Sequence, residues 1–119
     1  RIMTGDITIY HNPRCSKSRA TLELLKTEGR DPQLVEYLKE PPTAKTLDAI
    51  LDMLGMEPRD LMRTKEKEYK EAGLDHPDLG RDELIAAMIE HPRLIERPIV
   101  IANGKAAIGR PPEKVLEIL

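Results

Sequence analysis

Aromatic side chains and cysteine are scarce in this sequence. Its 119 residues include no tryptophan, no phenylalanine and a single cysteine, Cys15. Without Trp and Phe, the chain lacks the stacking platforms on which single-stranded nucleic acids usually bind. A lone cysteine excludes an internal disulfide framework and a cysteine-rich zinc site. It also favours a reducing compartment, so we expect a cytoplasmic protein.

Long apolar runs are missing as well. No stretch approaches the roughly 20 apolar residues of a membrane span, and the first residues do not form the apolar region of a signal peptide. Charged residues of both signs make up 34% of the chain, and the net charge is -2. This balance is typical of a well-solvated globular surface and argues against nucleic acid or membrane partners. The three histidines are dispersed without the spacing of a metal site.

The opening of the chain predicts a strand, a helix and a second strand. Residues 7–10 form a β-branched and aromatic run that is typical of a strand. An Asn-Pro turn follows, and residues 16–28 carry apolar side chains at helical spacing. Residues 34–38 predict the second strand. Because a crossover of this length joins parallel strands, we expect the two strands to be parallel neighbours.

The rest of the chain predicts a helical block followed by more sheet. Residues 43–92 contain amphipathic helical patterns and no strand signal. Thr43 can cap the first of these helices, and residues 65–72 predict a charged helix in which Glu66 and Lys70 lie four apart in the favourable order. A last helix is expected after the two prolines at 111–112, with Val115, Leu116 and Leu119 pointing inward. Between the helical block and the last helix, residues 98–102 and 105–108 predict two strands joined by an Asn-Gly hairpin turn. We therefore expect a single α/β domain over residues 1–119, with a four-stranded mixed sheet and a helical insertion at about 43–92.

Cys15 lies in the predicted turn between the first strand and the first helix. Unpaired backbone N–H groups and the helix dipole stabilise a thiolate there, and can lower a cysteine pKa from about 8.5 to neutral or below. Arg14, Lys17 and Arg19 add positive charge nearby in the sequence. The same turn suits a tetrahedral oxyanion. These features favour a nucleophilic thiol over an inert buried one.

The residue three positions after Cys15 decides how an adduct on the thiol is resolved. A redox dithiol would carry a second cysteine there, but this sequence has Ser18. An internal disulfide cannot form, so a thiol from another molecule, such as glutathione or glutaredoxin, must resolve any covalent adduct on Cys15.

The order of elements is that of a thioredoxin or glutaredoxin fold, and several motifs make the resemblance more specific. They are Ile9-Tyr10-His11-Asn12-Pro13-Arg14-Cys15 with Ser18 and Arg19, Tyr37-Leu38 with Pro41-Pro42-Thr43, Leu61-Met62-Arg63, His91-Pro92, Arg97-Pro98-Ile99-Val100 and Arg110-Pro111. With these motifs, over about residues 6–119, the chain resembles the ArsC family of glutaredoxin-coupled arsenate reductases, most closely its shorter, YfgD-type members.

The resemblance implies a function and a set of site residues. Cys15 matches the family's nucleophile, which forms a cysteine-thioarsenate intermediate, and His11 matches a histidine that supports catalysis. Arg63, Arg97 and Arg110 match three arginines that bind the oxyanion, a role that guanidinium groups suit because they stay charged and donate in pairs. The implied reaction reduces arsenate to arsenite with glutathione as co-substrate and glutaredoxin as partner, without a metal or a bound cofactor.

Two other functions fit the same motifs. A monothiol oxidoreductase acting on glutathionylated proteins would need Cys15 but not the three arginines. A regulatory binding module like the Spx proteins, ArsC-like relatives that bind RNA polymerase, would need no catalysis; the full arginine set and the missing second cysteine count against it. The resemblance also predicts a cis peptide bond between Arg97 and Pro98, at the start of a strand, where a proline is tolerated.

Overall fold

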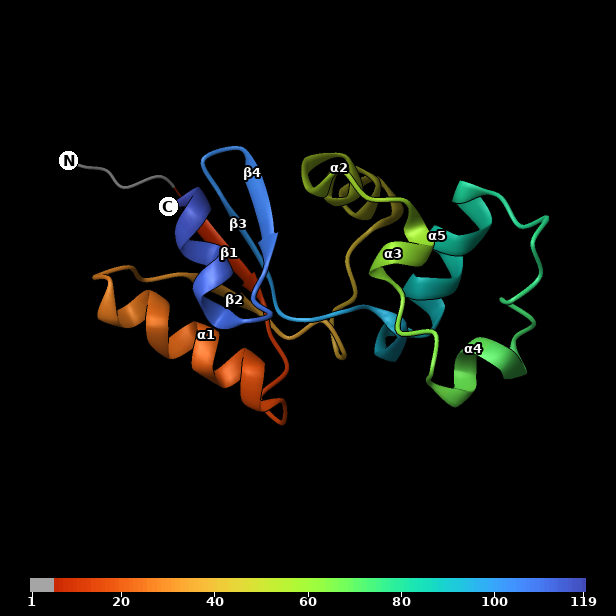
Figure 1. Cartoon of the computed structure of the whole chain (residues 1–119), viewed down its shortest axis with the longest axis horizontal. Helices are drawn as coiled ribbons and strands as arrows, with labels where there is room; N and C mark the ends of the chain where they lie inside the picture. Colours follow the sequence, from red (N-terminus) through yellow and green to blue (C-terminus); the bar gives the residue numbers. More distant parts are fainter. Residues whose placement is uncertain (1–5) are drawn as a thin grey trace. The chain divides into compact units, whose positions relative to one another are not determined.

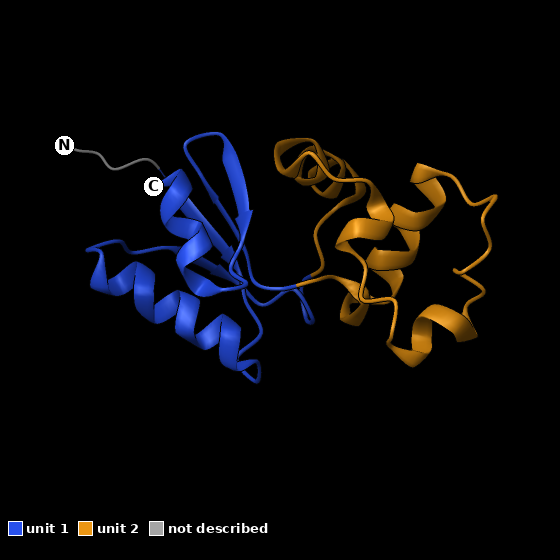
Figure 2. Cartoon of the chain, in the orientation of Figure 1, with its two compact units in different colours: residues 1–40, 97–119 blue, residues 41–96 orange. Residues whose placement is uncertain are grey.

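The computed structural model of the chain describes residues 6–119. These residues form two compact units, which are coloured separately in Figure 2. The first unit joins both ends of the chain, residues 1–40 and 97–119, and the second comprises residues 41–96. The predicted helical insertion, residues 43–92, lies within the second unit. No helix of the described chain is long and apolar enough to cross a membrane.

The first unit is built on a four-stranded mixed sheet in the order β2-β1-β3-β4. Strand β1 pairs in parallel with β2 and antiparallel with β3, which pairs antiparallel with β4. The strands are β1 (Ile7–Tyr10), β2 (Gln33–Val35), β3 (Ile99–Ala102) and β4 (Lys105–Ile108). The predicted mixed sheet and the parallel pairing of the first two strands are confirmed.

Two helices cover one face of this sheet, as Figure 1 shows: α1 (Ser16–Thr27) and the 3₁₀ helix η2 (Pro112–Ile118). Side chains alternate between the faces of a strand, so Ile7 and Ile9 of β1 point to the same side. There they form one buried cluster with residues of β3, α1 and η2: Val100, Ala102, Leu25, Val115 and Ile118. This core fixes the start of α1, and therefore Cys15, at the end of β1.

The hairpin between β3 and β4 has the predicted turn. Asn103 and Gly104 both have positive φ, at 57° and 72°, which is the backbone of a tight two-residue hairpin. The side chain of Asn103 also donates a hydrogen bond from Nδ2 to the carbonyl oxygen of Ile118, 2.9 Å away. The turn therefore ties the last helix to the sheet.

The second unit is helical. It contains α2 (Ala44–Leu54), α3 (Pro58–Leu61), α4 (Lys67–Glu71), α5 (Arg81–Glu90) and the short 3₁₀ helix η1 (Pro92–Leu94). Thr43 caps α2 as predicted, because its Oγ1 accepts a hydrogen bond from the backbone N–H of Thr46 at 3.1 Å. Arg81 joins α5 to α2 through ion pairs with Asp48 and Asp52.

Two sequence predictions about elements are wrong. The second strand was predicted over residues 34–38, but β2 ends at Val35, and the N–H groups of Lys39 and Glu40 both bond to the carbonyl oxygen of Glu36 in a turn. The last helix was predicted to bury Leu116, which is 40% exposed. Because a 3₁₀ helix repeats every three residues, η2 buries Val115, as predicted, together with Ile118, while Leu119 is partly buried against the same core.

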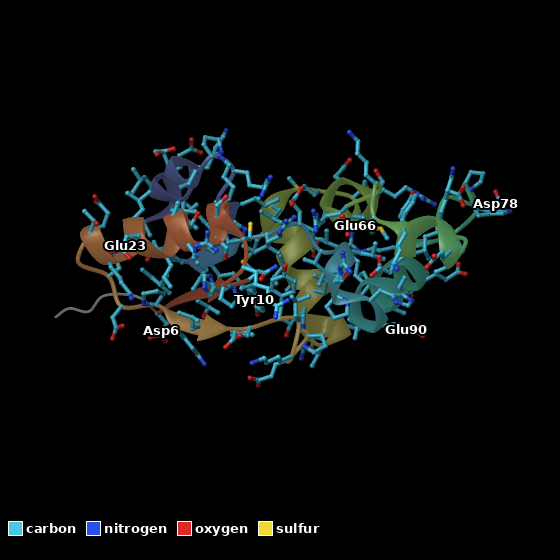
Figure 3. The ribbon with its side chains drawn as sticks, turned by 90° about the horizontal axis from the view of Figure 1, so that it is seen from below. Asp6, Tyr10, Glu23, Glu66, Asp78 and Glu90 are labelled. Atoms are coloured by element: carbon cyan, nitrogen blue, oxygen red, sulfur yellow. The ribbon has the colours of Figure 1, made fainter. Side chains whose placement is uncertain are left out.

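A third prediction is wrong at the start of α4. The sequence placed Glu66 inside a helix, four residues before Lys70, where the two would pair. The helix begins at Lys67, so Glu66 (labelled in Figure 3) lies just before it as the N-cap residue. The Glu66 carboxylate bonds to Arg93 at 2.8 Å and to Arg63 at 3.3 Å. Two arginines from neighbouring segments therefore replace the local lysine.

Candidate active site

Cys15 is the N-cap residue of α1. Its backbone is extended, with φ −95° and ψ 123°, and the helix begins at Ser16. The residue is 9% exposed. At an N-cap, a side-chain acceptor faces the first backbone N–H groups of the helix, which have no partner within the helix itself. The predicted placement of the thiol at the helix start is therefore what the structure shows.

The pKa of the Cys15 thiol is lowered from its usual value. Burial raises this pKa, but hydrogen bonding to the backbone N–H groups of Ser18 and Lys17 and the positive charges of Arg97 and Arg110 together outweigh burial. Sequence proximity had pointed to Arg14, Lys17 and Arg19 as the source of charge. The arginines that act on the thiol come instead from segments far along the chain. A lowered pKa increases the fraction of reactive thiolate at neutral pH.

Asn12 shapes the turn that presents the thiol. Its carbonyl oxygen accepts a hydrogen bond from the N–H of Cys15, and its Oδ1 accepts one from the N–H of Arg14, both at 3.0 Å. Arg19, one turn into α1, donates from Nη1 to the carbonyl oxygen of Pro13 at 2.8 Å. This turn is fixed from both sides, so the position of Cys15 does not depend on a flexible loop.

His11 is buried just before the turn and is held by Ser18. The Nδ1 atom of His11 lies 2.6 Å from Oγ of Ser18, and the same oxygen accepts a hydrogen bond from the N–H of Asn12 at 3.0 Å. Burial lowers the pKa of His11; Glu36 opposes this, while Arg19 and Lys26 add to it. The lowered pKa favours the neutral ring at pH 7, and Nδ1 and the Ser18 hydroxyl share one hydrogen bond.

Arg97 and Arg110 lie on the segments that flank the β3–β4 hairpin. The Arg97–Pro98 peptide bond is cis, as predicted, and so is the Arg110–Pro111 bond, which was not predicted. Arg110 donates from Nη1 to the carbonyl oxygen of Arg97 at 3.4 Å. The two segments are joined by a hydrogen bond of 2.9 Å from the N–H of Gly109 to the carbonyl oxygen of Pro98.

Gly109 allows this close approach. A Cβ atom at Gly109 would lie 2.9 Å from Cγ of Pro98 and 3.0 Å from Cγ2 of Thr21, both too short for an ordinary contact. Only glycine fits between α1 and the cis proline without a shift of one of them. The close packing of Gly109 against Thr21 therefore fixes the backbone position from which the Arg110 side chain extends.

Arg63 belongs to the second unit. Its N–H donates to the carbonyl oxygen of Leu94 at 2.7 Å, and its guanidinium pairs with Glu66. The structure thus brings four of the five predicted site residues together in the first unit: Cys15, His11, Arg97 and Arg110. The catalytic and oxyanion-binding roles of all five stay predictions.

Sequence reasoning missed three residues that shape the site. Apart from their place in the family motif, Ser18 was noted as the position of an absent second cysteine and Asn12 as a turn former. Gly109 gave no signal, because the close packing that requires a glycine joins segments distant in sequence. An Asn directly before Pro in a turn is the one local signal that could have been developed further.

No group of three or more His, Cys, Asp or Glu side chains among residues 6–119 is arranged to hold a metal ion. The groups that act on the Cys15 thiol are backbone N–H groups and guanidinium groups. Such a set can stabilise a thiolate and bind an oxyanion next to it.

A cysteine at the N-cap of the helix that follows the first strand of a mixed four-stranded sheet defines a thiol protein of thioredoxin-like fold. The ArsC family model matches residues 10–118 of the chain. The protein therefore belongs to the ArsC family.

Close relatives agree with this assignment. An Escherichia coli K12 protein named "Uncharacterized protein YfgD" is 58% identical, with 98% of this chain and 99% of that protein covered. A Neisseria meningitidis protein named arsenate reductase is 51% identical, with 96% and 98% covered. The solved structure of an arsenate reductase from Vibrio cholerae is 52% identical, covers 98% of this chain and 100% of its own, and superposes with a TM-score of 0.95. The predicted YfgD-type membership and the thioredoxin-like fold are confirmed.

Proposed function

We propose that this protein is an arsenate reductase that works in the cytoplasm with glutathione and glutaredoxin. The observation that carries the proposal is the Cys15 thiol, whose pKa is lowered by backbone N–H groups of α1 and by Arg97 and Arg110. The charges of Arg97 and Arg110 reach this thiol within the first unit, which supports a role for both in binding an oxyanion beside it. The relatives named arsenate reductase share this chain over nearly its whole length.

In the first step the Cys15 thiolate attacks the arsenic of arsenate. A sulfur–arsenic bond forms, an arsenic–oxygen bond breaks, and the oxygen leaves as water after taking a proton. Arsenic stays As(V). Arg97 and Arg110 stabilise the charge on the remaining oxygens, and we assign the same role to Arg63 from the family resemblance.

In the second step a glutathione thiolate attacks the sulfur of Cys15. A sulfur–sulfur bond forms, and the sulfur–arsenic bond breaks with its electron pair left on arsenic, which becomes As(III) and leaves as arsenite after protonation. Cys15 and glutathione supply the two electrons and end as a mixed disulfide. Glutaredoxin then reduces this disulfide by thiol exchange, because the chain has no second cysteine to do so.

His11 supports the first step by holding the turn that precedes the thiol. A neutral imidazole adds no positive charge to the site, and its hydrogen bond to Ser18 ties the residue after β1 to the first turn of α1. We propose that His11 positions the cysteine turn and that its protonated form has no part in the reaction at neutral pH.

The deciding experiment measures arsenate-dependent oxidation of glutathione by the purified protein with glutaredoxin present. The wild type should turn over many times, and Cys15→Ser should be inactive while retaining its fold, because a hydroxyl is a far poorer nucleophile at neutral pH. Ser16→Ala, one residue away and exposed, is the matched control and should keep its activity.

Two results would contradict the proposal. Turnover retained in Cys15→Ser would remove the thiol from the mechanism. Sustained turnover by the wild type without any added thiol would remove glutathione and glutaredoxin from it.

A further inference from the structure

A cavity of about 320 Å³ opens in the first unit beside the cysteine turn. One wall is the turn itself, with His11, Asn12 and Arg14. The other is the turn that follows β2, with Glu36, Leu38 and Lys39. Its size is at the lower end of the range for small-molecule sites, which suits a ligand of tripeptide size. Arg14, on the wall formed by the cysteine turn, directly precedes Cys15 in the sequence.

Charges of both signs line the cavity. Arg14 and Lys39 are cationic and exposed, and Glu36 is anionic. Glu36 and Lys39 form a long ion pair, with 3.7 Å between Oε1 of Glu36 and Nζ of Lys39, and the Lys39 side chain is 78% exposed. Such a pair contributes little to stability, so both partners can bond to a ligand at small cost. Leu38, which is 40% exposed, adds an apolar surface between them.

This arrangement complements a small zwitterionic peptide. Glutathione carries two carboxylates and one ammonium group on a tripeptide backbone, with its thiol at the centre. Arg14 and Lys39 match the two carboxylates, and Glu36 matches the ammonium group. Because Arg14 directly precedes Cys15, a tripeptide held between these two turns lies beside the cysteine turn.

We propose that this cavity is the binding site for glutathione, the thiol that the proposed function requires as co-substrate. The inference rests on that function for its biological meaning, although binding of the tripeptide can be measured without arsenate. In the reaction, the bound thiolate attacks the Cys15 sulfur of the arsenic adduct, as written above, and the cavity raises the local concentration of that thiol.

The test uses the full-length reduced protein and glutathione disulfide. The Cys15 thiolate attacks one sulfur of the disulfide, a new sulfur–sulfur bond joins Cys15 to glutathione, and one glutathione thiolate leaves. The second-order rate constant is measured by mass spectrometry, and then again with the uncharged disulfide of 2-mercaptoethanol. The ratio of the two constants reports recognition of the tripeptide and cancels any change in the reactivity of Cys15 itself.

Charge reversal should lower this ratio. Lys39→Glu and Glu36→Lys should each reduce the preference for glutathione disulfide by about fivefold, because an attraction at an exposed site is replaced by a repulsion. Lys114→Glu and Glu113→Lys, exposed residues on η2 outside the cavity, are the matched controls and should leave the ratio within about twofold of wild type, since distant surface charges are screened.

The outcomes separate this inference from the proposed function. A ratio that is unchanged in both cavity variants, or lowered equally in the controls, would overturn the glutathione site even if arsenate is reduced. A ratio lowered only in the cavity variants would support the site even if arsenate is not reduced, and would then favour the oxidoreductase acting on glutathionylated proteins.

Discussion

The hydroxyl oxygen of Ser18 lies 2.6 Å from Nδ1 of His11, and both residues are buried. Ser18 belongs to the first turn of α1, and His11 follows β1 directly. The Ser18 hydroxyl also accepts the N–H of Asn12, and the backbone N–H of Ser18 helps to lower the pKa of the Cys15 thiol. One serine therefore holds the turn before the nucleophile with its side chain and stabilises the nucleophile with its backbone.

Ser18→Ala should destabilise the protein by about 1–3 kcal/mol, because it leaves a buried N–H and a buried imidazole nitrogen without their partner. The measurement is denaturant unfolding of the reduced protein. Ser16→Ala, at an exposed position of the same helix, should change the free energy of unfolding by no more than about 0.5 kcal/mol. Equal effects of the two substitutions would show that the Ser18 hydroxyl does not hold the turn.

His11 should titrate with a midpoint below 6.5, because burial lowers its pKa and outweighs the opposite effect of Glu36. A buried neutral histidine resists protonation, so the folded protein should lose stability as the pH falls below the unfolded value of about 6.5. NMR titration of the imidazole measures the midpoint. A value above 6.5 would mean that Glu36, not burial, controls His11, and Glu36→Gln would then lower it.

Alkylation of Cys15 should show a midpoint below about 8.5, the value of a free thiol. Arg97→Ala should raise the midpoint more than Arg110→Ala does, because Arg97 lowers this pKa more. Lys114→Ala, on η2, is the control for loss of an exposed positive charge. Because the folded pKa is lowered, the thiolate stabilises the fold at pH above the unfolded pKa, and this contribution is lost as pH falls through the folded pKa. A wild-type midpoint at or above that of a free thiol would contradict the assignment.

Local signals in the sequence were enough to predict much of the fold. The hairpin at Asn103 and Gly104, the cap at Thr43 and the cysteine at the start of α1 each depend on a few neighbouring residues. The end of β2 was predicted wrongly because Tyr37, which is 2% exposed, continues the apolar pattern from a turn. Burial of a side chain does not require its backbone to be in a strand.

The details of the site depend on tertiary packing. Arg97 and Arg110 were predicted as site residues only through the family motifs; nothing in their local sequence indicates that they act on Cys15. The bond between His11 and Ser18 joins a strand end to a helix, and the role of Gly109 depends on Thr21 and Pro98 together. Such relationships appear only when the segments are folded against each other.

Gly109→Ala should destabilise the protein by about 1–3 kcal/mol, because the new methyl group would overlap Thr21 and Pro98. Thermal or denaturant unfolding measures the change. Gly80→Ala is the control for steric overlap, since its Cβ would meet its nearest neighbour, Oε1 of Glu83, at an ordinary 3.7 Å. Gly80 is the N-cap of α5, so this variant should cost only the weaker N-cap preference of alanine, about 1 kcal/mol or less.

A double-mutant cycle tests the cause. Thr21→Ala removes both the hydroxyl and the methyl group that crowd position 109, so Gly109→Ala should destabilise this background less than it destabilises wild type. The same destabilisation in both backgrounds would show that contact with Thr21 is not responsible.

The three arginines should differ in what their removal changes. Arg97→Ala and Arg110→Ala should both lower kcat/KM for arsenate by about tenfold or more, and both should raise the Cys15 pKa, because each loses a positive charge near the thiol. Charge alone is not sufficient for paired hydrogen bonds, so the corresponding Lys variants should restore the pKa more fully than kcat/KM. Steady-state kinetics and alkylation measure the two effects separately.

Arg63 has a structural alternative, because it shares the Glu66 carboxylate with Arg93. Arg93→Ala is therefore its matched control: it removes the other guanidinium bound to the same carboxylate. If Arg63 binds the oxyanion, Arg63→Ala should lower kcat/KM for arsenate about tenfold while Arg93→Ala leaves it unchanged, and each should alter the free energy of unfolding by about 1 kcal/mol or less. Equal kinetic losses would assign Arg63 to holding Glu66. Unchanged kinetics in Arg63→Ala, Arg97→Ala and Arg110→Ala together would contradict oxyanion binding and transfer support to the thiol oxidoreductase or the regulatory binding module.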